Sequence, residues 1–334
     1  MHCPLPPSVS PLPCTRRALL AAAAAALAAP QALALAQADY PSKPIRLIVS
    51  IPPGSTTDSM LRYVAERMGT LLGQPLVVDS RPGANGVVGT RGVATAPPDG
   101  YTIGMTSNGT LSAAPYLFKN PGYDIHRSFV HIGPVAYLPY TLVVQKEVPA
   151  RNLKDFLAYV RANPGKLSTG YYANSLRMAV SDFKRSAALD VMEVPYKAAP
   201  QLLTDMKLGL VHFAFVPLSV GMLGQQSDIL RIMGVTTARR WSVIQDVPTL
   251  AEELPGFENV AWIALSAPAG TPPAQVARLG RALNHVLQSP ETREKWHGWG
   301  ADLAIGSGPD VERLVARDGP LWAQFAKEAN IAPE

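Results

Sequence analysis

Strand-like and helix-like segments alternate from residue 45 onward, and this alternation restricts the possible folds more than any other feature of the sequence. Ile45–Val49 is a run of β-favouring residues. Apolar residues then recur at helical spacing between residues 60 and 72, and Gly73 follows as a typical C-terminal cap. The pattern continues with a strand at 76–78, a helix at 87–96 and a strand at 101–106. This β-α-β-α-β order predicts a parallel, doubly wound sheet.

The same alternation returns in the second half of the chain. Asn152, with Asp155 three residues later, resembles a capping box and predicts a helix that ends at 163–165. Further strands are predicted at 167–169, 192–194, 212–216, 229–235 and 260–265, and further helices near Asn174, Pro200, Pro273, Pro290 and Pro309. Proline is favoured at the first position of a helix, where its missing N–H group costs nothing.

These elements predict an α/β fold of two lobes, because 334 residues exceed one typical domain. We expect the first lobe to be split between residues 39–143 and 265–334. The second lobe is expected as the insertion 144–264. The chain would then cross between the lobes near 142–144 and 265–267, and these two crossings are the predicted hinge.

The first 38 residues have the organisation of a cleavable export signal. Arg16 and Arg17 precede an apolar run at 18–29, which is about 12 residues long, whereas a membrane span needs roughly 20. An A-x-A site at 36–38 predicts cleavage after Ala38, which makes Asp39 the first mature residue. The two arginines fit a twin-arginine signal as well as an ordinary Sec signal. We therefore expect a periplasmic protein.

Composition excludes several classes of function. The formal net charge is +5, and the basic residues are spread along the chain, so no nucleic-acid partner is expected. Cys3 and Cys14 both lie in the predicted signal, which leaves the mature chain without thiolate or disulfide chemistry. His126 and His131 are five residues apart, which is not a helical metal-binding pair. No metal or organic cofactor is expected.

No catalytic motif is complete. Ser219 lies in P-L-S-V-G, where proline replaces the first glycine of the nucleophile elbow G-x-S-x-G. The glycines at 83–89 do not form G-x-G-x-x-G, and no phosphate-binding loop with lysine occurs. We therefore expect a binding protein and not an enzyme.

Two donor-rich turns follow strands of the predicted sheet, where ligands of open parallel sheets bind. Ser55, Thr56 and Thr57 come after the first strand, and their hydroxyl and N–H groups can receive an anion. The alternative is that Thr57 or Asp58 only caps the next helix. The second turn follows the strand at 101–106 and comprises Ser107, Asn108, Gly109 and Thr110. Its alternative role is a tight turn at Asn108–Gly109.

Taken together, these stretches resemble the Bug family of periplasmic binding proteins, the TctC-like receptors of tripartite tricarboxylate transporters. The matching stretches span the mature chain in the family's order: YPSKPIRLIVSIPPGSTTD (40–58), LGQPLVVDSRPGANG (72–86), APPDGYTIGM (96–105), NGTLSAAPYLF (108–118), VPYKAAPQLLTDM (194–206), DVPTL (246–250), GF (256–257) and APAGTPP (267–273). The resemblance implies a type II periplasmic-binding fold. It also implies a solute carboxylate held by main-chain amides, hydroxyls and water.

Several positions depart from the family pattern and leave the solute open. Ser55 replaces the second glycine of a P-P-G-G turn, and Val216 stands where the family has an acid. In the loop at 172–177, Ser175 is kept, but Arg177 replaces a common histidine. Asn85 and Ser175 complete the expected ligand set. We expect the Arg177 guanidinium to bind a second acidic group of the solute. The alternative is that Arg177 is a solvated side chain on the helix surface.

The sequence therefore predicts capture of a small mono- or dicarboxylate in an interlobe cleft, for uptake through an inner-membrane tripartite transporter. Tyr171 and Tyr172 are placed to flank an aromatic acid, and ordinary packing is their alternative role. A receptor that presents its ligand to a membrane kinase would use the same fold and the same closure. An exported hydrolase is the third reading, disfavoured by the missing nucleophile–base pair. A monomer is expected.

Overall fold

The computed structural model describes residues 40–333. The predicted signal at 1–38, its cleavage site and Asp39 lie outside the described residues. The chain divides into two compact units, Met1–Ser42 and Lys43–Glu334, and the fold described below belongs to the second unit. Among the described residues, no helix is long and apolar enough to cross a membrane.

Within residues 40–333, ten strands form one sheet, in which the path β2-β1-β3-β9-β4-β7-β5-β6 is extended by β8 and β10, both paired with β4. The strands are β1 (Ile45–Val49), β2 (Leu76–Ser80), β3 (Thr102–Ser107), β4 (Phe129–Gln145), β5 (Ser168–Tyr171), β6 (Met192–Pro195), β7 (Phe213–Pro217), β8 (Leu230–Val235), β9 (Val260–Pro268) and β10 (Asp302–Leu303). β1, β2 and β3 are parallel, as are β5, β6 and β7. These two sets confirm the predicted α/β alternation.

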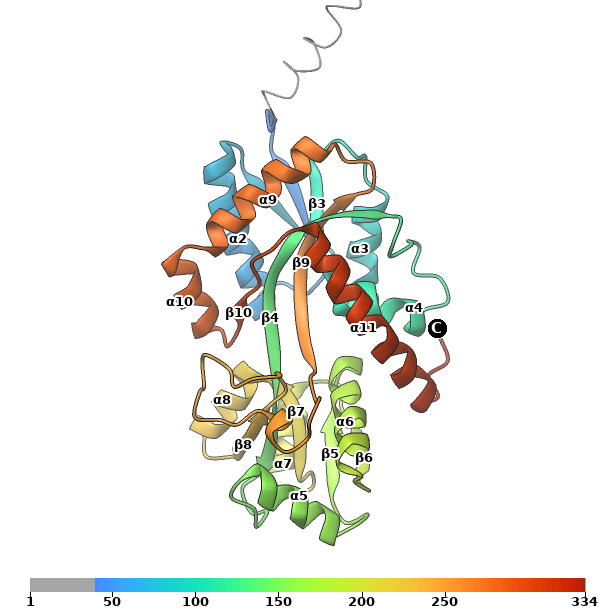
Figure 1. The fold of residues 1–334 in the computed structure, drawn as a ribbon, viewed down its shortest axis with the longest axis vertical. Helices are drawn as coiled ribbons and strands as arrows, with labels where there is room; N and C mark the ends of the chain where they lie inside the picture. Colours follow the sequence, from blue (N-terminus) through green and yellow to red (C-terminus); the bar gives the residue numbers. More distant parts are fainter. Residues whose placement is uncertain (1–39, 334) are drawn as a thin grey trace, which may run out of the picture. The chain divides into compact units, whose positions relative to one another are not determined.

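Two further strands join these parallel sets. β4 was not predicted from the sequence, and β9 was predicted only over 260–265. β4 pairs antiparallel with β9 from Phe129 to Pro139, and from Tyr140 onward with β7 and β8. Figure 1 shows β4 and β9 running side by side between the elements around β3 and those around β7. The sheet is therefore mixed and not purely parallel. The β-α-β pattern could not reveal this, because β4 and β9 are not reached through crossover helices.

The helices cover the sheet and largely begin where the sequence predicts. They are α2 (Thr56–Leu72), α3 (Val87–Ala94), α4 (Ala114–Leu117), α5 (Leu153–Ala162), α6 (Asn174–Ala187), α7 (Ala199–Lys207), α8 (Leu218–Gln226), α9 (Pro273–Leu287), α10 (Pro290–Gly298) and α11 (Gly308–Glu328), with short turns η1 (Ala84–Gly86), η2 (Asn108–Ala113) and η3 (Leu250–Glu252). Gly73 ends α2 in the left-handed region at φ 75°, as predicted. Asn152 Oδ1 accepts a hydrogen bond from Asp155 N at the start of α5. α8 was not predicted.

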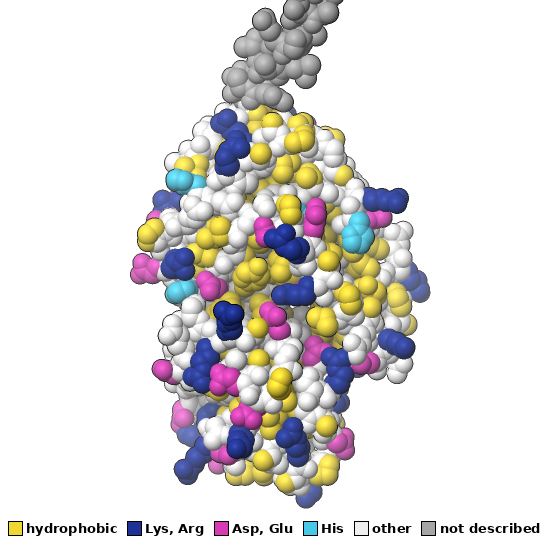
Figure 2. All heavy atoms as spheres, in the orientation of Figure 1, with side chains coloured by type: hydrophobic (Ala, Val, Ile, Leu, Met, Phe, Trp, Pro, Cys, Tyr) yellow, Lys and Arg dark blue, Asp and Glu magenta, His cyan; other side chains and the backbone are white. Residues whose placement is uncertain are grey.

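Separate hydrophobic clusters support the two halves of the sheet. The cluster beside β5 and β7 is aromatic, with Phe183 in edge contact with Phe213, Phe215 and Phe257. The cluster around β3 and β9 contains Ile48, Leu111 and Trp262, among others. Each half thus has apolar packing of its own, and β4 and β9 connect them. Figure 2 shows basic and acidic side chains interspersed over the face in view, without the one-sided charge of a nucleic-acid surface.

Candidate functional site

Several helical segments follow strands of the sheet, and four of them bear on the site. α2 follows β1, η2 follows β3, α6 follows β5 and α8 follows β7. The first N–H groups of a helix have no partner inside the helix, and the peptide dipoles give that end a partial positive charge. A place where several helices begin is therefore favourable for an anion.

The first turns of three of these helices line one cavity of about 520 Å³, here called cavity A. Strand β4 forms one wall, and the segment after α10 closes one side. The lining of cavity A comprises residues 54–57, 138–140 and 217–220 together with Tyr172, Ala173, Ser175, Leu176, Ala261, Trp299 and Gly300. The volume lies within the range of about 300–1,000 Å³ that is usual for small-molecule sites.

A second cavity of about 420 Å³, here called cavity B, adjoins the first. Both cavities include Ala173 and Ser175, so they meet at the start of α6. The lining of cavity B comprises residues 50–52, 82–83, Asn85, Gly86, Gly109, Ala113, Leu117, Ala173, Asn174, Ser175 and Trp322. Together the two cavities form a cleft between the halves of the sheet.

The lining of this cleft carries no charged side chain. Among the residues that the structure describes in cavities A and B, none is Asp, Glu, Lys, Arg or His. The ionisable groups are the phenols of Tyr140 and Tyr172, and burial raises the pKa of both above the usual tyrosine value. Both phenols therefore stay neutral at physiological pH. A charged ligand must be held here by dipoles and hydrogen bonds and not by ion pairs.

Ser55 caps α2, with its Oγ accepting a hydrogen bond from Asp58 N at 3.2 Å. The two residues proposed from the sequence for this role were Thr57 and Asp58. Asp58 instead closes the loop, accepting from Gly54 N at 3.0 Å and from Arg62 Nε at 2.8 Å. Burial alone would raise the pKa of Asp58, but the hydrogen bonds from Arg62 and Gly54 outweigh it and lower the pKa. The charge of Asp58 is thus matched by Arg62.

The N–H groups of Thr56 and Thr57 remain free of any partner within residues 40–333. α6 leaves similar donors at Asn174 and Ser175, because its N-cap residue is Ala173, which has no side chain that can cap. All four residues line the cleft. The first turns of α2 and α6, one from each half of the sheet, therefore offer unused donors to the same space.

Ser50 adds an unpaired hydroxyl to cavity B. The residue is only 3% exposed, and its Oγ has no hydrogen-bond partner among the described residues. Buried hydroxyl groups without a partner are uncommon and destabilising unless a ligand or water satisfies them. Ser50 lies at the end of β1, yet the sequence pattern did not single it out because the donor-rich turn begins several residues later.

The turn after β3 uses its hydroxyl groups internally. Ser107 N donates to Thr110 Oγ1 at 3.0 Å, and Thr110 N donates to Ser107 Oγ at 3.4 Å, which forms a capping box at η2. Thr110 is buried, and Asn108 lines a different cavity, of about 190 Å³, beside α6 and α11. Of the four residues predicted here, Gly109 lines the cleft.

Arg177 lies outside the lining of both cavities. Its Nε is 3.2 Å from Glu193 Oε2 on β6, and its guanidinium lies over the ring of Tyr171. Ser175 faces the cleft, and two residues further along a helix correspond to about 200° of rotation. The helix therefore turns Arg177 away from the cleft and toward β6. Val216, which stands where the family has an acid, is fully buried in the core beside α7.

Sequence reasoning missed most of the apolar wall of cavity A. Tyr140 lies within β4, and Trp299 and Gly300 follow α10, so no local motif connects them with the turns after β1 and β5. Segment 217–220 was noticed only for its resemblance to a nucleophile elbow. Its position at the end of a strand was the signal that could have assigned it to the cleft. Ser219 lines cavity A, but no histidine or acid there can activate it.

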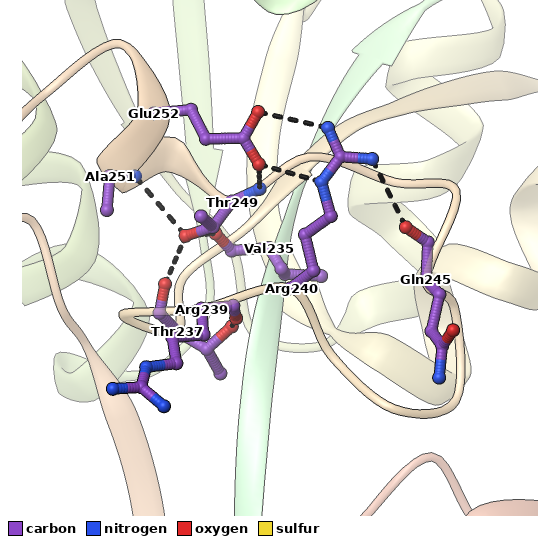
Figure 3. A network of polar contacts seen from close by, with 8 residues as sticks. All are labelled: Val235, Thr237, Arg239, Arg240, Gln245, Thr249, Ala251 and Glu252. Atoms are coloured by element: carbon purple, nitrogen blue, oxygen red, sulfur yellow. Dashed lines mark hydrogen bonds and ion pairs between the residues drawn. The ribbon is translucent and has the colours of Figure 1, made fainter.

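One motif of the resemblance, DVPTL at 246–250, has a structural role that Figure 3 shows. Thr249 Oγ1 donates to Thr237 O and accepts from Ala251 N, which ties the loop after β8 to η3. Arg240 forms a bidentate ion pair with Glu252, with 2.8 Å from Nε to Oε1 and 3.0 Å from Nη2 to Oε2, and it also donates to Gln245 O. None of these residues lines cavity A or B.

Comparison with known proteins shows a family and a fold that this chain resembles. Residues 60–331 match the profile described as tripartite tricarboxylate transporter family receptor, TctC. A UPF0065 protein of Bordetella bronchiseptica is 31% identical over 323 residues, which cover 95% of this chain and 94% of the relative.

Two solved structures have a similar fold. R. palustris Rpa4515 with adipate has a TM-score of 0.75 and 32% identity, covering 89% of this chain and 100% of the other. The periplasmic binding protein BugD has a TM-score of 0.71 and 30% identity, covering 88% and 100%. The resemblance and the fold class expected from the sequence are thereby confirmed.

Proposed function

We propose that this chain, which belongs to the tripartite tricarboxylate transporter family of receptors, binds a small carboxylate in the cleft formed by cavities A and B. Receptors of this family bind solutes and are not enzymes. The observation that carries the proposal is the pair of helix starts, α2 and α6, whose first residues have free N–H groups and line one uncharged space. The carboxylate is proposed to lie where the two cavities meet.

The chemistry of the lining favours an anion over other ligands. Free N–H groups at helix starts are donors with partial positive charge, and no lining side chain supplies the negative charge that a cationic ligand would need. The relative with 32% identity, Rpa4515, was solved with adipate, a dicarboxylate, which supports the same ligand class for this chain. Ser55, Thr56, Thr57, Asn85, Gly109 and Ser175 are the proposed ligand-binding residues from the sequence, and Ser50 and Asn174 join them.

Arg177 is not part of this proposal. Its charge is already matched by Glu193, and withdrawing it would leave that half-buried carboxylate with Lys184 alone. Ser107, Asn108 and Thr110 are also left out as direct ligands. The capping box occupies the hydroxyls of Ser107 and Thr110, and Asn108 borders another cavity.

The family comprises periplasmic receptors, and we propose that the mature chain begins at Asp39 and delivers its solute to the membrane subunits of a tripartite transporter. N-terminal sequencing of the exported protein should give Asp39 as the first residue. A periplasmic form that retains residues 1–38 would contradict the proposed signal.

We further propose that the two halves of the sheet are lobes that close on the solute. The proposed crossings are the partner exchange between Pro139 and Tyr140 in β4 and the start of β9 at Val260, a few residues from 142–144 and 265–267. Lobes with separate cores move by default unless a large apolar interface joins them. Small-angle scattering should show a smaller radius of gyration at ligand saturation. An unchanged radius would contradict the closure.

Proline substitutions test the N–H groups directly. Thr56 and Asn174 are the first residues of their helices, and the preceding residues, Ser55 and Ala173, are extended, with ψ 161° and 152°. Proline fits a first helical position, where its effect on the main chain is the loss of the N–H donor. Each hydrogen bond to a charged group contributes about 1.5–3 kcal/mol, so Thr56→Pro and Asn174→Pro should each weaken carboxylate binding about tenfold or more.

Three controls separate the N–H group from other effects. Thr56→Val and Asn174→Ala remove the side-chain polar group but keep the N–H group, and should weaken binding less. Ala199→Pro makes the same change at the first residue of α7, which lies outside both cavities, and should leave affinity unchanged. Calorimetric titration with the best ligand from a carboxylate thermal-shift screen provides the measurement. Equal binding by wild type and both cleft proline variants would refute the proposed site.

A further inference from the structure

We infer that the solute is a monocarboxylate with an apolar or aromatic body, and that the far end of cavity A selects against a second carboxylate. The inference rests on the proposed function and adds the substrate class. It follows from what lines cavity A beyond the start of α6. That end is formed by Leu138, Pro139, Leu218, Val220, Ala261 and Trp299.

The side chains that form this end of cavity A are apolar, except for the exposed hydroxyl group of Ser219. Leu138 and Pro139 come from β4, Ala261 from the neighbouring position on β9, and Leu218 and Val220 from α8. Trp299 completes the wall and packs against the buried ring of Trp296, with 5.5 Å between the ring centres. An aliphatic chain or an aromatic ring would bury its surface here favourably, at about 25 cal/mol per Å².

The start of α8 is the one helix N-terminus at this end, and the chain itself crowds it. Gly300 has φ 73°, and a Cβ placed on it would lie 3.3 Å from both Ser219 N and Leu218 Cγ. The backbone after α10 therefore lies directly against the first turn of α8. Pro217, the residue before that turn, offers no side-chain cap. Gly300 thus restricts the space in front of these donors.

The phenol groups of Tyr140 and Tyr172 lie toward the other end of cavity A, near the start of α6. Tyr140 lies close enough to Ser175, at the start of α6, for the Ser175 side chain to influence its titration, and Tyr172 lies beside Tyr140. Their hydroxyl groups can thus support the first carboxylate. A second carboxylate placed beside Trp299 would lose part of its hydration and meet no charged side chain of the described lining, which is unfavourable.

Matched pairs of acids test the selection. Butanoate and succinate, hexanoate and adipate, and benzoate and terephthalate differ within each pair only in the second carboxylate. Calorimetric titration of the mature protein should give at least tenfold tighter binding of the monoacid in every pair that binds. Tighter or equal binding of the diacid in those pairs would overturn the inference while leaving the proposed function intact. Failure of all six acids to bind would overturn both.

A charge added to the far end should reverse the preference. Ser219 is exposed and lines cavity A, so Ser219→Lys places an ammonium group within reach of a second carboxylate without disturbing the core. The matched control is Gln226→Lys, an exposed position on the same helix outside both cavities. Ser219→Lys should bind the diacid of the best pair at least tenfold more tightly than wild type does, and Gln226→Lys should not. An identical effect of both variants would show a general charge effect and contradict the assignment of the far end.

Discussion

The indole Nε1 of Trp262 donates a hydrogen bond to the carboxylate of Asp318 at 2.7 Å, which fastens strand β9 to helix α11 behind the cleft. Both residues are buried, and Arg317 Nε approaches the other carboxylate oxygen at 2.7 Å. A hydrogen bond to a buried charged acceptor contributes about 1.5–3 kcal/mol. Trp262→Phe should therefore lower the free energy of unfolding by roughly 2–4 kcal/mol, including the lost volume.

Trp322→Phe is the matched control for this prediction. Trp322 is similarly buried and lies on α11, but its indole makes no side-chain hydrogen bond within residues 40–333. Urea unfolding should show a clearly smaller loss for Trp322→Phe than for Trp262→Phe. Equal losses would mean that ring volume, and not the bond to Asp318, is what stabilises this junction.

Stability should fall as pH falls because of His131. Its Nδ1 lies 2.8 Å from Ser266 Oγ in the core, and burial, with a smaller effect of His126, lowers the pKa of His131 to about 4. In the unfolded chain the pKa is about 6.5, so the unfolded state takes up a proton first as pH falls below 6.5. Stability is complete above pH 6.5 and declines until about pH 4, by on the order of 3 kcal/mol.

His131→Asn isolates this effect, because the amide keeps a polar atom near Ser266 but does not titrate. Between pH 6.5 and 5, the free energy of unfolding should depend on pH less steeply in the variant than in wild type. Restricting the comparison to this range avoids the protonation of most carboxylates. Parallel slopes for the two proteins would contradict the assignment to His131.

The loop at 236–250 should depend on its buried threonine more than on its surface ion pair. Thr249 is 4% exposed and caps η3 while bonding to Thr237 O, so Thr249→Val should cost about 1–2 kcal/mol. Arg240 and Glu252 are well exposed, and surface pairs contribute little. Arg240→Ala should therefore change the urea midpoint far less than Thr249→Val. The reverse order would indicate that the ion pair holds the loop.

The sequence predicts the regular elements better than their pairing. Local signals such as Gly73 and the Asn152–Asp155 pair act within one turn of chain, and the structure places caps at both. The antiparallel course of β4 depends on partners far away in the sequence, which no local pattern contains. The same holds for cavity A, where Tyr140 and Trp299 meet only through tertiary packing.

The candidate site shows a second limit of sequence reasoning. The segment 107–110 was expected to donate to the ligand, with a tight turn at Asn108–Gly109 as the alternative, and the hydrogen bonds of Ser107 and Thr110 instead form a capping box. Arg177 was expected to face the cleft because its segment does, but helical rotation decides the direction of each side chain. Uncapped helix starts such as that of α6 are visible in the sequence only as the absence of a capping residue.

The affinity for the solute should be nearly independent of pH between about 6 and 9. Nothing that lines cavities A and B titrates in that range, because burial raises the pKa of Tyr140 and Tyr172 above the ordinary value of about 10. The ligand carboxyl, with a pKa near 4–5, is ionised throughout. Below about pH 5 it becomes protonated and loses its attraction to the helix starts, so binding should weaken there.

Calorimetric titrations at pH 6, 7, 8 and 9 test this, each in two buffers of different ionisation enthalpy. Equal binding enthalpies in the two buffers, after correction for dilution, indicate that no proton is exchanged on binding. Tyr172→Phe should keep the same flat profile, because its phenol is neutral throughout. A tenfold change in affinity between pH 6 and 9, or proton uptake on binding, would show that a titrating side chain outside the described lining contacts the solute. The carboxylate would then not be held by main-chain donors alone, and the proline substitutions at Thr56 and Asn174 should have correspondingly small effects.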